Sequence, residues 1–327
     1  MGYPRGIVMK GWRRLLVWLG LLGILAGCSG EPPVSVTIGV NRWLGYEPLF
    51  VARANQSLPS SVRLAEFTST SEGMRAFRNG ALDAVAVTLD EALSLAQLVP
   101  DLSIGLVVDY SDGADVLLAR PGLKRVEDMV GRRVGVDSLV VGAYLLGRAF
   151  DSRNLDISQT RIVHVPMGRH NLDFSALNVD ALVTFEPYRS QQLARGAVQI
   201  FSSANVPGEI TDVLVFRRSL PQDKQRQLQQ VAQTWFDAVD RLLRYDPAAI
   251  AVVAERQALT PSQVQEALEA MKFPGIRANR TLLNPENSEL NPVLVRLAAR
   301  MREMDLLTRP VRLDTLLDDR LVREVKS

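Results

Sequence analysis

Two stretches of the chain resemble one another at a nearly constant separation, and this internal repeat constrains the fold more than any other feature. Ile38–Asn41 matches Val134–Asp137 at an offset of 96 residues, and Phe77–Ala84 matches Phe174–Ala181 at an offset of 97. In both copies an apolar strand-like run follows the Asp-Ala pair. Two matches at nearly the same offset indicate a duplicated structural unit, so we expect two similar lobes.

Apolar, β-branched runs alternate with helix-like patterns after a short proline-containing stretch. This alternation is typical of mainly parallel sheets with crossover helices. The expected strands are Val34–Val40, Val62–Phe67, Ala84–Leu89, Leu102–Val108, Ala114–Ala119, Arg133–Asp137, Arg161–Val165, Ala181–Phe185, Val198–Ser202 and Val213–Phe216.

The chain divides into a first lobe at 34–110, a second lobe at 111–212 with hinge segments at both ends, and a return to the first lobe at 213–327. The last part is helical by its spacing of apolar residues, among which Trp235 is expected in the core. Two crossings between the lobes predict a hinge and a cleft that closes on a ligand. The expected fold class is α/β, with two lobes joined by a two-strand hinge and a C-terminal helical tail on the first lobe.

The N-terminal residues have the pattern of a secretory signal. Four basic residues and no acidic one precede an apolar run at 15–25, which is shorter than the ~20 residues needed to span a bilayer. Leu25-Ala26-Gly27-Cys28 then resembles the lipobox of bacterial lipoproteins. We expect a signal peptide at 1–27 and a lipidated tether at 28–33, with the lipid on Cys28. An uncleaved membrane anchor that happens to contain a cysteine is the alternative, and Ser29 favours outer-membrane sorting.

Composition excludes several functional classes. Without residues 1–27 the chain has 34 basic and 36 acidic residues, so no positive excess favours nucleic acid. Cys28 is the only cysteine, and His164 and His170 are the only histidines. The mature body therefore has neither a disulfide nor a thiolate metal site, and we expect no metal and no cofactor.

In open α/β sheets, ligands bind beyond the carboxyl ends of the strands, so the loops there are candidate sites. In the first lobe, Trp43, Gly45 and Tyr46 either contact a ligand or plug the lobe. Ser69 and Thr70 begin a helix, where they either cap it or help its free amides to bind an anion.

The corresponding loops give further candidates. Val140 and Val141 are expected to form an apolar wall in the second lobe. Asp90 and Glu186 follow equivalent strands, where each carboxylate either binds an amine or caps a helix. His170 is expected to face solvent, as is Arg169, and His164 to be a hydrogen-bonded core residue. The turn at 109–115 is expected to act as a hinge.

Five motifs carry a family resemblance: Trp43-x-Gly45-Tyr46-x-Pro48, Gly80-x-x-Asp83-Ala84, Asp109-Tyr110-Ser111-x-Gly113-Ala114-Asp115, the segment Val126–Val136, and Asp180-Ala181 followed by Glu186-Pro187-Tyr188. In this order they resemble the periplasmic binding proteins of the nitrate/sulfonate/taurine and thiamine-pyrimidine group. The resemblance implies a type II binding-protein fold and an ABC permease and ATPase as partners. It also implies ligand contacts at Trp43, Tyr46, Ser69, Thr88, the Val140 loop and Glu186.

The sequence departs from that group in two ways. No arginine is clearly directed into the cleft, unless Arg42 or Arg169 turns inward, so an amine or a heterocycle suits the site as well as a sulfonate does. The cysteine-rich motif of the related yeast pyrimidine-synthesising enzyme is absent.

The sequence as a whole predicts a monomeric, non-enzymatic solute-binding lipoprotein of an ABC importer. It is expected on the periplasmic or cell-surface face of a bacterial membrane, held there by its lipid, and to bind a small polar, amine or sulfonate-type solute. The alternative is a ligand-sensing lipoprotein that signals to a membrane partner.

Overall fold

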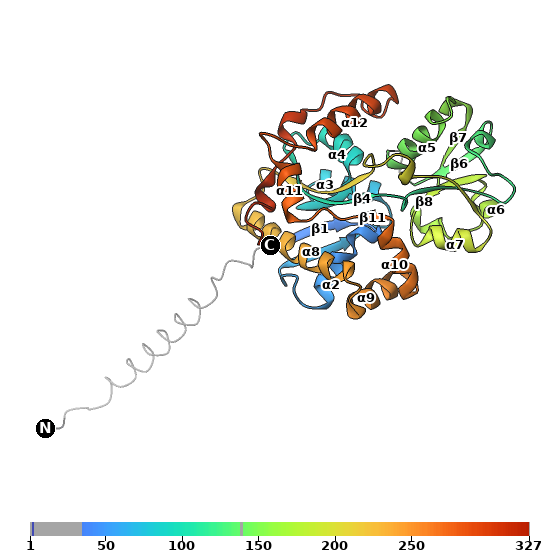
Figure 1. Ribbon diagram of the computed structural model, residues 1–327. Helices are drawn as coiled ribbons and strands as arrows, with labels where there is room; N and C mark the ends of the chain where they lie inside the picture. Colours follow the sequence, from blue (N-terminus) through green and yellow to red (C-terminus); the bar gives the residue numbers. More distant parts are fainter. Residues whose placement is uncertain (1, 3–34, 138–139, 327) are drawn as a thin grey trace. The chain divides into compact units, whose positions relative to one another are not determined.

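The computed structural model describes residues 2, 35–137 and 140–326. The predicted signal peptide, Cys28 and most of the tether lie outside the described residues. Residues 35–137 and 140–326 form two α/β lobes, each built on one mixed sheet (Figure 1). Among the described residues, no helix is both long enough and apolar enough to cross a bilayer.

The first sheet has the strand order β11-β4-β10-β3-β1-β2. In it β1 runs parallel to β2 and β3, whereas β10 runs antiparallel to β3 and β4. The strands are β1 (Val36–Val40), β2 (Val62–Glu66), β3 (Ala84–Thr88), β4 (Leu102–Ser111), β10 (Thr211–Arg217) and β11 (Met271–Lys272). The two-residue β11 was not predicted.

The second sheet repeats this arrangement in the order β7-β6-β8-β5-β9. Ile38 pairs with Ala84 in the first sheet and Val134 with Ala181 in the second, so the sequence repeat is also a repeat of strand register. The strands are β5 (Val116–Ala119), β6 (Arg133–Val136), β7 (Arg161–His164), β8 (Ala181–Thr184) and β9 (Val198–Ser202).

Two segments connect the lobes, one between β4 and β5 and one between β9 and β10. They are bonded to each other, because Ser203 donates its amide to the Asp115 carbonyl at 2.9 Å and Ser111 donates its amide to the Ile210 carbonyl at 3.0 Å. The side-chain oxygens of Ser111 and Ser203 lie 2.8 Å apart. The crossings therefore form a paired two-strand hinge.

The C-terminal helices pack on the first lobe, where α8 contacts α2 and α12 contacts α4 (Figure 1). Trp235 is fully buried in that core, as predicted. The helices are α2 (Glu47–Ala54), α3 (Thr70–Arg78), α4 (Leu89–Ala96), α5 (Val141–Asp151), α6 (Phe174–Leu177), α7 (Tyr188–Ala194), α8 (Gln222–Leu243), α9 (Pro247–Gln257), α10 (Pro261–Glu269), α11 (Ile276–Leu283) and α12 (Asn291–Glu303).

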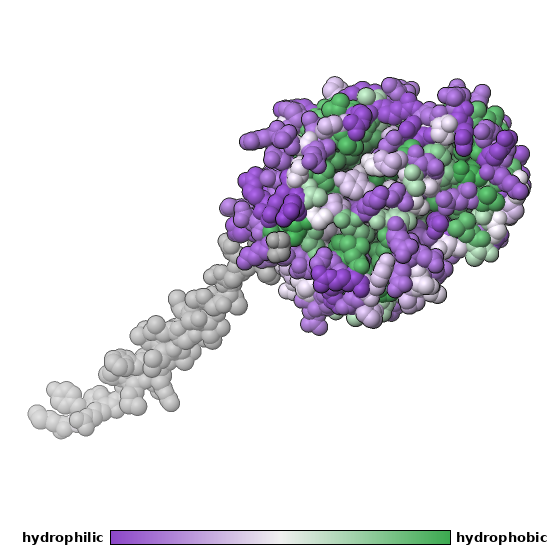
Figure 2. All heavy atoms as spheres, viewed as in Figure 1, coloured by the Kyte–Doolittle hydropathy of each residue, from purple (hydrophilic) through white to green (hydrophobic). Residues whose placement is uncertain are grey.

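The face of the molecule shown in Figure 2 is mostly polar along its edge. On the face shown in Figure 2, hydrophilic residues cover most of the periphery, and hydrophobic residues show mainly toward the middle of that face. The cavities described next lie between the lobes.

Candidate functional site

The two lobes touch through aromatic side chains. Trp43 of the first lobe and Phe185 of the second meet edge to face, with their ring centroids 5.4 Å apart. One cavity between the lobes has Phe185 in its wall, and a second one shares Asp137 with it. The inner cavity measures about 40 Å³ and the outer one about 570 Å³.

The inner cavity draws its walls from both lobes and from the hinge. Thr70 comes from the start of α3, Asp115 from the first crossing, and Asp137 from the carboxyl end of β6. The remaining lining residues are Val141, Gly142, Leu145, His170, Val183, Thr184 and Phe185. This is the strand-end position at which α/β proteins bind ligands.

The inner cavity is acidic. Burial raises the pKa of Asp115 to about 7, against a lowering effect of the Ser111 hydroxyl and with a further increase from the nearby Asp90 charge. Burial also raises the pKa of Asp137, while the amide of Met167, which donates to its carboxylate at 2.9 Å, lowers it. Neither Lys nor Arg is among the described residues that line this cavity.

His170 adds no positive charge to the inner cavity at neutral pH. Its ring nitrogens lie 3.0 Å from the Thr184 hydroxyl and 3.0 Å from the Val165 carbonyl. Burial lowers the pKa of His170 to about 4, so the ring is uncharged near pH 7. The two carboxyl groups thus have no cationic neighbour in the cavity wall.

More buried acidic groups lie in the first lobe next to this cavity. Trp43 donates its indole N–H to Asp109 at 3.0 Å, and Tyr46 donates its hydroxyl to Asp212. Burial raises the pKa of Asp109 to about 8, against a lowering effect of the Trp43 hydrogen bond and with a smaller contribution from the Asp115 charge. One oxygen of Asp90, one of Asp109 and the hydroxyl of Thr88 are buried without a hydrogen-bond partner. Even so, no three metal-ligating side chains of the described chain converge to hold a metal ion.

The outer cavity is mixed in charge. It opens beside α3, whose N-cap residue Ser69 accepts a hydrogen bond from the Glu72 amide at 3.3 Å. Arg75 and Arg78 line it from the same helix. Ser69 and Glu72 themselves line the cavity, and the other lining residues are Thr68, Ser71, Met74, Ser94, Leu95, Leu98, Asp137, Val140, His164 and Pro166.

Comparison with known proteins identifies the family. A sequence model of the NMT1-like family matches residues 29–258. The chain belongs to the NMT1-like family. A search of curated proteins finds no match to it.

Solved structures share the fold of this NMT1-like protein. The alkanesulfonate-binding protein SsuA of Xanthomonas axonopodis pv. citri, bound to MOPS, is 18% identical with a TM-score of 0.72, covering 86% of this chain and 97% of that one. The periplasmic aliphatic sulphonate binding protein SsuA of Escherichia coli is 19% identical with a TM-score of 0.70, covering 89% and 99%. The zinc-bound ligand-binding component of an ABC-type import system from Staphylococcus aureus is 12% identical with a TM-score of 0.73, covering 89% and 99%. The predicted family resemblance and the two-lobed binding-protein fold are therefore confirmed.

Four of the residues singled out in the sequence line the interlobe cavities. Thr70 and Val141 line the inner cavity, and Ser69 and Val140 line the outer one. They come from the starts of α3 and α5, which follow the carboxyl ends of β2 and β6.

The other candidates lie in the protein interior. Trp43, Gly45, Tyr46, Thr88 and Asp90 are buried in the first lobe and line neither interlobe cavity. Trp43 and Tyr46 are held by the two buried aspartates, which corresponds to the plug interpretation of that loop. Thr88 caps α4.

Glu186 is buried and its carboxylate is fully bonded at the start of α7. It accepts the Ser190 amide at 3.1 Å, the Ser190 hydroxyl at 3.0 Å and an Arg189 N–H at 3.0 Å. These contacts correspond to helix capping, the second of the two roles expected for this residue.

Both histidine predictions are wrong. His164 is exposed on the outermost strand of the second sheet and lines the outer cavity, because β7 has no neighbouring strand on its far side. His170 is fully buried, because a short 3-10 helix at Met167–Arg169 turns its ring toward Thr184. Arg169 is exposed, as expected.

Sequence reasoning did not predict ligand contacts at several charged residues of the cavities, among them Asp115, Asp137, Arg75 and Arg78. The repeat could have indicated Asp137, because Asp137 is the counterpart of Asn41 at the end of an equivalent strand. In the structure the Asn41 side-chain amide donates to the Thr70 hydroxyl at 2.8 Å. The two arginines are the cations of the outer cavity that the sequence did not indicate. Arg42 lines another cavity between the lobes, of about 260 Å³, which has Tyr188 in its wall and shares Thr68 with the outer cavity.

Proposed function

We propose that this NMT1-like protein is the solute-binding lipoprotein of an ABC importer, which captures a small molecule between its lobes and presents it to the permease and ATPase. The observation that carries the proposal is the pair of cavities between two lobes joined by a paired hinge. Closure of such lobes removes a ligand from water and creates a distinct state for a membrane partner to recognise.

The proposal extends to the location of the protein. The lipid on Cys28 would hold a monomeric binding protein on the periplasmic or cell-surface face of the membrane. A doubly or triply acylated cysteine gives stable attachment, whereas one chain gives marginal binding.

We propose further that the ligand carries an ammonium group. Asp115 and Asp137 face the inner cavity, and its described lining offers no cation to balance them. Burying a carboxylate without a charge partner is costly, and an ammonium ion donates the hydrogen bonds that these oxygens can accept. A sulfonate in the same place would meet two acidic groups.

The volumes of the two cavities fit a ligand whose ammonium group lies in the inner cavity. A cavity of about 40 Å³ accommodates a group of the size of one water molecule, such as a primary ammonium. The body of the ligand would extend past Asp137 into the outer cavity of about 570 Å³. An acidic group at its far end would face Arg75 and Arg78.

A thermal-shift screen tests the proposal with small primary amines, matched sulfonates without an amine, and aminopyrimidines. An amine at about a hundred times its dissociation constant should add about 2.7 kcal/mol of apparent stability. Sulfonates without an amine should leave the melting temperature unchanged. A panel in which only amine-free sulfonates act would refute the ammonium proposal, and one in which nothing acts would refute solute binding.

The Asp137→Asn variant tests whether the ligand binds in the cleft. Removing the charge should weaken an amine ligand by more than about tenfold, since a charged hydrogen bond contributes roughly 1.5–3 kcal/mol. Asp173→Asn is the matched control, because Asp173 is in the same lobe and its side chain is 72% exposed. Isothermal titration calorimetry measures both; equal affinities for the two variants would remove Asp137 from the site.

A further inference from the structure

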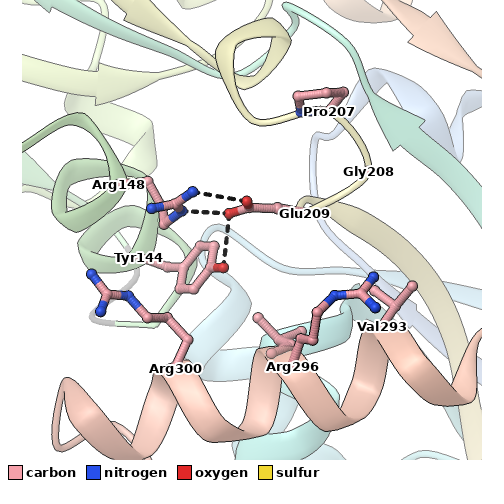
Figure 3. A pocket seen from close by; sticks show the side chains of 9 residues that line it. Tyr144, Arg148, Pro207, Gly208, Glu209, Val293, Arg296 and Arg300 are labelled. Carbon is pink, nitrogen blue, oxygen red and sulfur yellow. Dashed lines mark hydrogen bonds and ion pairs between the residues drawn. The ribbon is translucent and has the colours of Figure 1, made fainter. Parts of the chain in front are cut away.

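A separate cavity of about 510 Å³ lies between α5, the second crossing and α12 (Figure 3). Helix α5 belongs to the second lobe, and α12 packs on the first. The lining residues are Tyr144, Arg148, Pro207, Gly208, Glu209, Val293, Arg296, Leu297 and Arg300. Both lobes and the hinge therefore contribute to one cavity, which shares no lining residue with the inner or outer cavity of the cleft.

The one acidic residue in this lining is already neutralised. Glu209 accepts N–H groups of Arg148 at 2.6 and 3.0 Å, and the Tyr144 hydroxyl at 2.9 Å (Figure 3). This bidentate pair fixes Arg148 and cancels the charge of Glu209. The described lining of the cavity contains no second acidic residue to balance the charges of Arg296 and Arg300.

Arg300 is paired on the side away from the cavity. It forms ion pairs with Asp151 and with Glu303, neither of which lines the cavity. Its Nε is buried without a hydrogen-bond partner. The Arg300 guanidinium is thus positioned by acidic residues outside the cavity and keeps one unused donor.

Arg296 lies one helical turn before Arg300 and is exposed. Among the described residues it forms neither an ion pair nor a side-chain hydrogen bond. In Figure 3 the side chains of Arg296 and Arg300 rise from α12 on the side facing Glu209. The cavity therefore contains a free guanidinium beside two others that are held in place.

We propose that this cavity is a second ligand site, which binds a small organic oxyanion. Arg296 holds the charged group, because a guanidinium matches a phosphate or carboxylate with two parallel N–H donors. Arg148 and Arg300 border the site in fixed positions, with their charges balanced by Glu209, Asp151 and Glu303. Val293 and Leu297 offer apolar contact to the rest of the molecule, and the cavity volume is within the range of small-molecule sites.

Calorimetry on the purified protein with phenyl phosphate, benzoate and phenol tests this site. The two anions carry the same ring with a phosphate or a carboxylate, and phenol carries it without a charge at neutral pH. Binding of either anion, with no binding of phenol, is the expected result, and the preferred anion assigns the oxyanion class. Absence of heat from both anions at millimolar concentration would overturn the proposal.

The Arg296→Gln variant tests whether the anion binds in this cavity, and Arg302→Gln is its matched control. Both residues are exposed arginines on α12, but Arg302 does not line the cavity. Arg296→Gln should weaken the anion at least tenfold, whereas Arg302→Gln should leave its affinity within twofold of wild type. Equal affinity of wild type and Arg296→Gln would overturn the proposal. Neither residue lines the cleft cavities, so this result is independent of the proposed solute-binding function.

Discussion

Gly45 is required by packing. A β-carbon at this position would lie 2.0 Å from an Asp109 carboxylate oxygen and 2.3 Å from the Trp43 indole nitrogen, which are themselves hydrogen-bonded to each other. Gly45→Ala should therefore destabilise the protein by about 1–3 kcal/mol, as overpacking of a core does.

Urea unfolding measures that loss for Gly45→Ala. Gly168→Ala is the control, since nothing lies within 4 Å of a β-carbon there. If both variants unfold at the wild-type urea concentration, the tight contact between Gly45 and Asp109 does not exist in solution.

The buried carboxyl groups predict a stability that falls as the pH rises. Asp115 and Asp109 have pKa values raised to about 7 and about 8, mainly by burial, against about 3.9 in an unfolded chain. Between those limits the folded protein holds protons that the unfolded chain has lost, so its stabilisation is lost as the pH rises through 7 and 8. His170, with its pKa lowered to about 4 by burial, acts in the opposite direction only below about pH 6.5.

The window from pH 6.5 to 8.5 therefore isolates the carboxyl groups. The urea midpoint of the ligand-free protein should fall across it, and Asp109→Asn should flatten the upper part of the curve. A wild-type midpoint that stays constant or rises would contradict the raised pKa values.

At the residue scale, the sequence indicated where helices begin after strands. Thr70 and Val141 begin α3 and α5 after β2 and β6, and both line the inner cavity, while their contact with a ligand stays a prediction. The sequence did not determine the direction of side chains that depend on a short loop: His170 points inward after one turn of 3-10 helix, contrary to the prediction, and for Glu186 ligand contact and helix capping were both left open, whereas its carboxylate accepts the Ser190 amide of α7. A single sequence contains no periodic signal for such turns.

The paired crossings are the element on which lobe movement depends. The buried Ser203 hydroxyl lies 2.8 Å from the Ser111 hydroxyl and accepts the Gly113 amide at 2.7 Å. Ser203→Ala leaves both of these groups without that partner. The expected cost is about 1–3 kcal/mol, the penalty for unsatisfied buried polar groups.

Urea unfolding again provides the measurement for Ser203→Ala. Ser175→Ala on α6 is the control, because that side chain is exposed. Hydrogen exchange at the Gly113 amide should also become faster in Ser203→Ala alone. An unchanged exchange rate would mean that the two crossings are not joined at this point.

At the level of elements the sequence was sufficient for most strands, because alternating β-branched runs and helical spacing mark each one. The order of the strands within each sheet could not be predicted from the sequence as well as the strands themselves. Strand β10 lies between β3 and β4, and β5 lies between β8 and β9, both antiparallel, so each sheet is completed by a strand from a crossing. Such pairing depends on contacts between distant segments, which local patterns do not contain.

For the whole molecule, the duplication explains why one cleft forms. Two copies of the same unit place their strand ends toward each other, and the hinge brings Asp115 between them. Contacts across the lobes come from unlike parts of the copies: Trp43 meets Phe185, and Arg300 of α12 meets Asp151 of α5. The C-terminal helices thus add a contact between lobes that the repeat itself does not supply.

The attachment of this two-lobed body to a membrane depends, in our proposal, on Cys28. Cys28→Ser removes the only thiol in the chain, so it should abolish labelling by radioactive palmitate and move the protein from the membrane fraction to the soluble fraction. Ser29→Ala is the matched control, since it leaves the acylated position intact. If Cys28→Ser remains in the membrane after an alkaline carbonate wash, the apolar run at 15–25 acts as an uncleaved anchor. In that case the tether would be a protein segment, and the cleft would be held at the membrane without a lipid.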